Sequence, residues 1–153
     1  MDPRTVRVSR DGRDRMADVP TITVTALCLV DDRGRLLLVR KRGTSLFMQP
    51  GGKPEPGETP AETGTRELSE ELGLAVRPAD LTLLGTWRGP AANEADTLLV
   101  ATVFLCPLTA EPLPAAEIEE LAWLDLGGAA GRRDLAPLLT DYVVPLLLGS
   151  RNA

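Results

Sequence analysis

The sequence of 153 residues contains no histidine and only two cysteines. Without histidine, Ser-His and Cys-His catalytic pairs and histidine-bound zinc sites are excluded. Cys28 and Cys106 each lie within an apolar run, and two cysteines are too few for a disulfide framework, so we expect buried free thiols. Any catalysis must therefore depend on carboxylates, arginines, hydroxyl groups or a metal ion.

Long apolar runs and basic clusters are also missing. No run approaches the length of about 18 residues that a membrane span requires, and the N-terminus lacks the apolar region of a secretion signal. We therefore expect a cytoplasmic protein with no membrane partner. The net charge of −5, without a basic stripe, argues against a nucleic-acid partner. An acidic protein can still bind anionic phosphates if divalent cations bridge the two.

Length and composition predict one domain preceded by a tail. Residues 1–18 are polar and rich in arginine, so we expect a flexible tail, in which Met16 is a candidate start of the protein. Residues 19–150 have the length of a single domain with a sizeable core. Only 3% of the residues are aromatic, so that core must consist mainly of Leu, Val and Ala.

Short β-branched and apolar runs predict a sheet with two helices. The run 21–30 is a strand candidate, and after the turn "DDRG" the run 35–42 is its expected hairpin partner. Asp134 is expected to cap a last helix over 135–148. The pattern indicates an α+β fold or an α/β/α sandwich with a mostly antiparallel or mixed sheet. The remaining strand candidates are residues 81–87, 96–108 and 121–126.

The segment "GGKPEPGETPAETGTRELSEELGL" contains six glutamates in 24 residues. Thr59, Pro60 and Glu62 form a capping box with proline at the first helical position, so a helix begins there. Gly73 is a favoured left-handed residue at a helix end. Helical periodicity places one apolar stripe against the sheet, which consists of Ala61, Thr65, Leu68 and Leu72.

The carboxylates of Glu67, Glu70 and Glu71 share a second face of this helix, at spacings i, i+3 and i+4. Like charges at these spacings repel and destabilise the helix, which a bound cation would offset. A solvated acidic face is the alternative interpretation. The glycines just before the helix favour a ligand, because they let the backbone pass close to it.

The segment resembles the Nudix box, G-x5-E-x7-R-E-U-x-E-E-x-G-U, in which U is aliphatic. The resemblance covers 23 residues directly and every specified position matches. It implies a Nudix fold with a mixed sheet between helices, and a MutT-like hydrolase that cuts a phosphoanhydride bond with water. The matching residues are Gly52, Glu58, Arg66, Glu67, Leu68, Glu70, Glu71, Gly73 and Leu74.

The resemblance also implies residue roles. Glu70 and Glu71 coordinate Mg²⁺, or alternatively Mn²⁺, with Glu67 as a further ligand or as the base and the Gly51 carbonyl as an extra ligand. Glu67 and Glu70 are therefore candidate catalytic residues, and Arg66 orients the box glutamates. The base can also come from a later loop, for which Glu117 and Glu120 are candidates; a solvated acidic turn is the alternative there.

Substrate recognition lies outside the box, where Arg40, Asn93 and Glu94 are candidates. We expect a small-molecule nucleotide, first a nucleoside triphosphate cleaved to a monophosphate and pyrophosphate. ADP-ribose or another nucleotide sugar is the alternative, since Pro90 lies 16 residues after Leu74, where ADP-ribose hydrolases of the family tend to have proline. A non-catalytic nucleotide-binding module is a third interpretation. The resemblance to the family also favours a homodimer.

Overall fold

The structure of this protein, a computed structural model, describes residues 19–151. The tail expected at 1–18, with the candidate start Met16, lies outside these residues. None of the helices in the described part of the chain is both long and apolar enough to cross a membrane.

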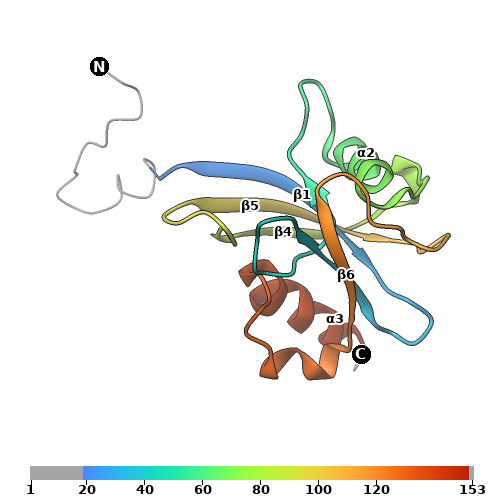
Figure 1. The fold of residues 1–153 in the computed structure, drawn as a ribbon. Helices are drawn as coiled ribbons and strands as arrows, with labels where there is room; N and C mark the ends of the chain where they lie inside the picture. Colours follow the sequence, from blue (N-terminus) through green and yellow to red (C-terminus); the bar gives the residue numbers. More distant parts are fainter. Residues whose placement is uncertain (1–18, 152–153) are drawn as a thin grey trace, which may run out of the picture.

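Two β-sheets form the middle of the fold (Figure 1). The first has four strands in the order β3-β1-β5-β4, in which β1 is parallel to β5 and the other pairs are antiparallel. The second pairs β2 antiparallel with β6. The mixed sheet expected from the sequence is therefore confirmed. The strands are β1 Thr21–Leu29, β2 Leu36–Lys41, β3 Gly51–Gly52, β4 Thr82–Pro90, β5 Leu98–Cys106 and β6 Ile118–Leu124.

Helices lie on both sides of these strands. Figure 1 shows α2 (Pro60–Leu72) on one side and α3 (Val144–Arg151) on the other, which confirms the expected sandwich. Three short turns complete the described elements: the 3₁₀ helices η1 (Pro78–Asp80) and η2 (Leu126–Gly131), and the π-helical turn η3 (Leu139–Val143).

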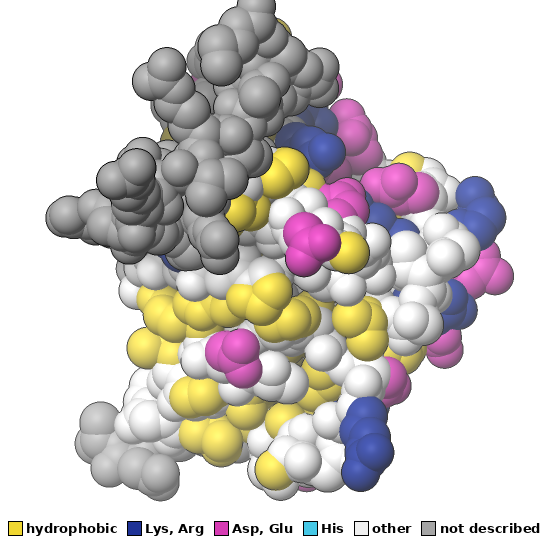
Figure 2. Space-filling model, turned by 90° about the vertical axis from the view of Figure 1, so that its left-hand side faces the viewer, with side chains coloured by type: hydrophobic (Ala, Val, Ile, Leu, Met, Phe, Trp, Pro, Cys, Tyr) yellow, Lys and Arg dark blue, Asp and Glu magenta, His cyan; other side chains and the backbone are white. Residues whose placement is uncertain are grey.

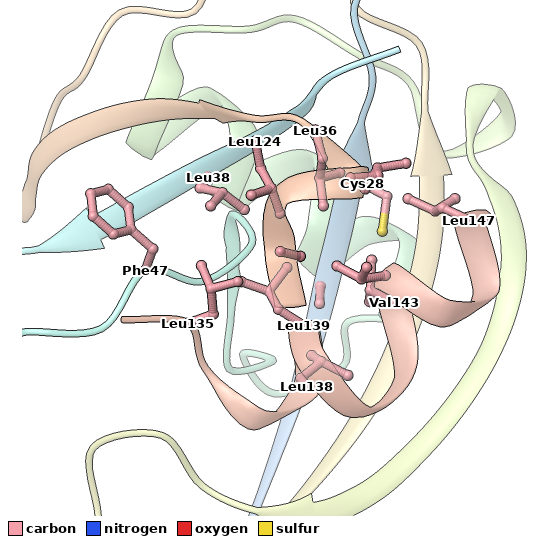
Figure 3. Close-up of a cluster of buried hydrophobic side chains, with 14 of the residues drawn as sticks. Cys28, Leu36, Leu38, Phe47, Leu124, Leu135, Leu138, Leu139, Val143 and Leu147 are labelled. Carbon is pink, nitrogen blue, oxygen red and sulfur yellow. The ribbon is translucent and has the colours of Figure 1, made fainter. Parts of the chain in front are cut away.

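The second half of β1 and the first four residues of β2 are buried on both faces, which explains their apolar runs. Ala26 and Cys28 point to the α3 side, where Figure 3 shows Cys28 beside Val143, whereas Leu27 and Leu29 point to the α2 side. The residues of β2 alternate in the same way. The two resulting apolar clusters hold the helices against the sheets.

The predicted hairpin between the first two strands is wrong. Strand β2 pairs with β6, and the two arms of the turn are joined just at its base, by the Val30–Leu36 bridge and a hydrogen bond from the Asp31 N–H to the Arg35 carbonyl. The reason is that β5 pairs with β1 along its whole length and β3 pairs with its other edge at Thr25 and Ala26. Strand β2 therefore has no long free edge of β1 to pair with.

Helix α2 has the ends that its sequence predicts. The Thr59 hydroxyl accepts a hydrogen bond from the Glu62 N–H at 3.2 Å, and the Glu62 carboxylate accepts one from the Thr59 N–H at 2.9 Å. Gly73 ends the helix with φ 68°, a left-handed conformation. These local signals fix both ends of the helix.

The buried face of α2 is rotated from the predicted one. Thr63, Gly64 and Glu71 are buried together with the expected Leu68 and Leu72, whereas Ala61 and Thr65 are only half-buried. Gly64 permits a close approach to β1, because a Cβ there would lie 3.1 Å from side-chain atoms of both Leu27 and Thr25. The helix consequently turns Glu71 toward the sheet.

The C-terminal helix begins later than predicted. Asp134 does not cap it, because its carboxylate forms two hydrogen bonds with Arg132 at 2.6 and 2.8 Å. Helical turns begin at Pro137, widen into the π turn η3 and continue as α3. Pro145, which has no N–H to donate, lies two residues after this wide turn. Figure 3 shows how Leu138, Leu139 and Val143 from these turns point toward the strands.

The core position Leu68 provides a test of the α2 packing. Its side chain is fully buried among apolar residues of β1, β2 and β5. Leu68→Ala should lower the free energy of unfolding by roughly 2–5 kcal/mol, because it leaves a cavity. Chemical denaturation measures the change. A loss below about 1 kcal/mol would show that α2 does not pack on the sheets as described.

Candidate active site

Arg66 connects the carboxylates at the exposed side of α2. Its Nε and Nη2 donate to both oxygens of Glu58, at 2.7 and 3.0 Å. Its Nη1 donates to Glu67 at 2.9 Å and to Glu70 at 3.3 Å, and Nη2 also donates to the Lys53 carbonyl at 2.9 Å. The paired guanidinium holds the pKa of Glu58 at about 2, and Glu58 raises that of Arg66. The Arg66 guanidinium thus holds three carboxylates in place.

Glu58 fixes the loop that precedes α2. Its Oε1 accepts hydrogen bonds from the Glu55 N–H at 2.7 Å and from the Thr63 hydroxyl at 3.0 Å. Together with the Arg66 bond to the Lys53 carbonyl, these contacts tie both ends of the loop to the helix. The loop is therefore positioned before any ligand binds.

Glu71 is buried between α2 and β3. Only 2% of the residue is exposed; its Oε1 accepts a hydrogen bond from the Gly51 N–H at 3.0 Å, and its Oε2 has no partner within residues 19–151. Burial raises the pKa of this carboxyl to about 8, although the Gly51 bond opposes the change. The carboxylates of Glu67, Glu70 and Glu71 therefore differ in exposure: Glu71 faces inward, while the Glu70 side chain is 52% exposed.

The two glycines of β3 let the backbone approach these carboxylates. A Cβ on Gly52 would overlap the Glu67 carboxylate, and one on Gly51 would overlap the Thr25 carbonyl oxygen. Gly51 also has φ 149°, which side chains disfavour. Burial raises the pKa of Glu67 against the opposing effect of Arg66. The glycine pair thus places β3 directly beside two acids.

A cavity of about 640 Å³ extends from this acidic end along β1. Gly51, at the acidic end, pairs with Ala26 of β1, and Leu99, at the far end, pairs with Ile22 of the same strand. The two ends are therefore separated by the length of β1 from Ile22 to Ala26, about 13 Å at a strand rise of about 3.3 Å per residue. One end is lined by Gly51, Gly52, Lys53, Glu55, Arg66 and Glu67, and the far end by Ile22, Ala91, Ala92, Asn93, Glu94 and Leu99.

The far end of the cavity belongs to a largely apolar side of the molecule. The start of β1 and the β4–β5 loop lie at the left of Figure 1, which is the side that Figure 2 faces. Hydrophobic side chains form a band across the middle of this face, and most charged side chains lie toward its right-hand edge (Figure 2). The cavity therefore joins a charged end to an apolar one.

The structure brings some of the predicted site residues together and leaves others apart. Asn93, Glu94 and Glu117 line the cavity. Glu117 is 59% exposed at its side chain and lies 3.3 Å from the Lys41 Nζ. Arg40 and Glu120 do not line it: the Arg40 Nε donates to Glu120 at 2.9 Å, and its Nη1 donates to the Thr44 carbonyl at 2.8 Å.

Sequence reasoning missed several polar residues of the cavity wall, among them Lys41, Gln49 and Lys53. Lys53 directly follows the glycine pair, and this position could have indicated a phosphate contact. Lys41 ends β2 and Gln49 lies in the segment before β3, and neither carries a local signal. Both reach the cavity only because the two sheets meet there.

The NUDIX domain family model matches residues 19–143 of this chain. The chain belongs to the Nudix hydrolase family. The isopentenyl-diphosphate Delta-isomerase of Saccharopolyspora erythraea is 33% identical over 89% of this chain and 77% of that protein. Phosphatase NudJ of Escherichia coli is 36% identical over 69 residues, which are 44% of this chain and 45% of NudJ.

Solved Nudix structures share the fold. The MutT protein from Methanosarcina mazei Go1 superposes with a TM-score of 0.70 at 22% identity, over 88% of this chain and 96% of that one. The MutT NUDIX hydrolase from Burkholderia pseudomallei superposes with a TM-score of 0.60 at 27% identity, over 70% and 84% of the two chains. The fold and the MutT-like resemblance are thus confirmed.

Nudix hydrolases generally use divalent metals, and the donors of this Nudix site fit a hard cation. Carboxylate and carbonyl oxygens are the ligands that Mg²⁺ prefers. The unpartnered Glu71 Oε2 is a buried acceptor that a cation would satisfy. Within residues 19–151, no three acidic or cysteine side chains are placed closely enough to hold a metal ion. The carboxylates of Glu67 and Glu70 accept hydrogen bonds from Arg66 instead. Arg66 therefore contacts carboxylate oxygens that a bound cation would also use.

The buried Glu71 predicts how the metal-free protein responds to pH. Because its folded pKa of about 8 lies above the ordinary 4.5, folding favours the protonated form. The stability from this group is complete below about pH 4.5 and is lost as pH rises through about 8, a change on the order of a few kcal/mol. Glu71→Gln removes the dependence.

Thermal melts in chelator at pH 6 and pH 8.5 measure this effect. The wild-type melting temperature should fall by several degrees more than that of Glu71→Gln between the two values. Adding Mg²⁺ at pH 8.5 should restore the wild type and leave the variant unchanged. Equal shifts in both proteins would show that Glu71 does not titrate in this range.

Proposed function

We propose that this protein uses a divalent cation to hydrolyse a phosphoanhydride bond of a nucleoside diphosphate-linked substrate. The preferred candidate substrate is a nucleoside triphosphate, which would be cleaved to a monophosphate and pyrophosphate. The observation that carries the proposal is the acidic end of the cavity, where Glu67 and Arg66 face the glycine pair. Carboxylates in that position favour a cation shared with phosphates.

Glu67, Glu70 and Glu71, with the Gly51 carbonyl, would hold Mg²⁺, or alternatively Mn²⁺. The bound cation supplies neutralisation of phosphate charge and a lowered pKa for water. Arg66 orients Glu67 and Glu70 through its hydrogen bonds. Lys53 and Lys41 line the cavity and supply positive charge to phosphate oxygens. Glu117, exposed in the cavity wall, is the base candidate favoured over Glu120, which is paired with Arg40.

Hydrolysis of ADP-ribose or another nucleotide sugar is the second candidate. The length of the cavity favours it, because about 13 Å beyond the glycine pair leaves room for a second group. Pro90 ends β4 next to the loop that carries Asn93 and Glu94, which we propose contact the substrate. We also propose a single domain at 19–150, a cytoplasmic location and a homodimer.

Glutamine substitutions test the metal site. Glu70→Gln and Glu71→Gln keep the side-chain shape and remove one charge each, so each should lower kcat by at least about 100-fold in saturating Mg²⁺. Glu119→Gln is the matched control, since Glu119 pairs with Arg42 and does not line the cavity. Its rate should stay within about twofold of wild type. Near-normal turnover of both box variants, or full activity in chelator, would contradict the proposal.

A substrate panel tests the reaction. Nucleoside triphosphates, ADP-ribose, a nucleotide sugar and isopentenyl diphosphate are incubated with Mg²⁺, and the products are identified by chromatography. We expect the highest kcat/KM for a nucleoside triphosphate, with pyrophosphate released. Preference for ADP-ribose selects the second candidate. Conversion of isopentenyl diphosphate to its isomer, without hydrolysis of any nucleotide, would overturn both.

A further inference from the structure

Gln49 is a buried amide in the wall of the cavity. Only 5% of the residue is exposed, and its Nε2 makes no hydrogen bond within residues 19–151. The residue lines the cavity two positions before Gly51. An amide N–H that is removed from water without a partner is costly, so native structures rarely leave one unpaired without a reason.

The backbone on both sides of Gln49 is fixed. The Met48 N–H and carbonyl both bond with Val39 of β2, at 2.9 and 2.8 Å. The Pro50 carbonyl accepts a hydrogen bond from the Leu27 N–H of β1 at 2.9 Å, and the Gly51 N–H donates to Glu71. The segment therefore joins the two sheets and holds the Gln49 side chain at one position before any ligand binds.

The cavity around Gln49 is apolar. Val24 and Ala26 of β1, with Met48, Ala136 and Leu138, line the stretch between the acidic end and the far end. Burial raises the pKa of the Cys28 thiol, and a weak contact with the Gln49 amide opposes this increase, although the contact does not meet the geometry of a hydrogen bond. A thiol is only a weak acceptor and leaves the amide available for a stronger one.

We propose that Gln49 is a specificity-determining residue, whose amide hydrogen-bonds an acceptor on a heterocyclic ring of the group attached to the substrate's phosphates. The apolar wall accommodates the faces of such a ring, and the amide pairs with a carbonyl oxygen or ring nitrogen at its edge. An alkyl diphosphate can fill the same space but leaves the amide unpaired, which a hydrogen-bonding site rejects strongly. The inference rests on the proposed function and adds the residue that selects the base.

Gln49→Met tests the inference, because it keeps the side-chain length and removes the amide. The comparison uses kcat/KM for each of the four nucleoside triphosphates and for ribose 5′-triphosphate, which has no base. For the preferred nucleotide the variant should lose about 10- to 100-fold, mainly through KM, whereas hydrolysis of ribose 5′-triphosphate should change less than about threefold. The ratio of the two values is the readout.

Cys28→Ala is the control for a purely structural role. This substitution removes the thiol beside Gln49. Because Cys28 does not line the cavity, the ratio should stay at its wild-type value. Thermal melts provide a second readout: Gln49→Met should not melt below wild type, because it removes an unpaired buried amide. Equal slowing on both substrates, or a lower melting temperature with an unchanged ratio, would overturn the inference.

Binding measurements separate this inference from the proposed hydrolysis. Calorimetry with methylene-bridged, non-hydrolysable triphosphates of the nucleoside and of ribose reports on Gln49 without turnover. A preference for the nucleoside that disappears in Gln49→Met supports the inference, whether or not the protein hydrolyses nucleotides. The same preference in wild type and variant overturns it and leaves the hydrolase proposal standing.

Discussion

The hydrogen bond from the Gly51 N–H to the buried Glu71 carboxyl joins α2 to β3, and the acidic end of the cavity depends on it. A carboxylate in this position is half satisfied: one oxygen has the Gly51 N–H, and the other has no partner among residues 19–151. Burial without full pairing destabilises the charged form, which is why the pKa of Glu71 is raised. The fold therefore keeps an acid where only a proton or a cation completes its bonding.

The contacts around this bond all serve to bring charge and backbone together. Gly52 has no side chain where the Glu67 carboxylate lies, and Gly64 lets α2 lie close to β1. Arg66 neutralises part of the acidic cluster and ties the preceding loop to the helix. The shortest hydrogen bond of Arg66, at 2.7 Å, goes to Glu58, so the guanidinium would stay anchored there while a bound cation competes for Glu67 and Glu70.

The parts of the fold that depend on residues close together in the sequence were predictable from it. The capping box at Thr59 and the left-handed Gly73 follow from local rules, and the structure has both. The partner of β2 was not predictable, because it depends on which edges of β1 are already occupied. The inward orientation of Glu71 was missed for a similar reason: the close packing of Gly64 on β1 sets the rotation of α2, and helical periodicity does not include it.

The same distinction explains why the chemistry is easier to read than the substrate. The acidic end of the cavity comes mainly from one continuous segment, residues 51–71, so its pattern is visible in the sequence. The other end combines β1, the β4–β5 loop, β5, the segment before β3 and the turns before α3, which meet only in the folded protein. Proteins with different names can therefore resemble this chain, and it is similar both to an isopentenyl-diphosphate Delta-isomerase and to a MutT NUDIX hydrolase. Gln49, whose neighbours bond to both sheets, belongs to this second end, and its amide is the polar group that we propose separates substrates with the same phosphate contacts.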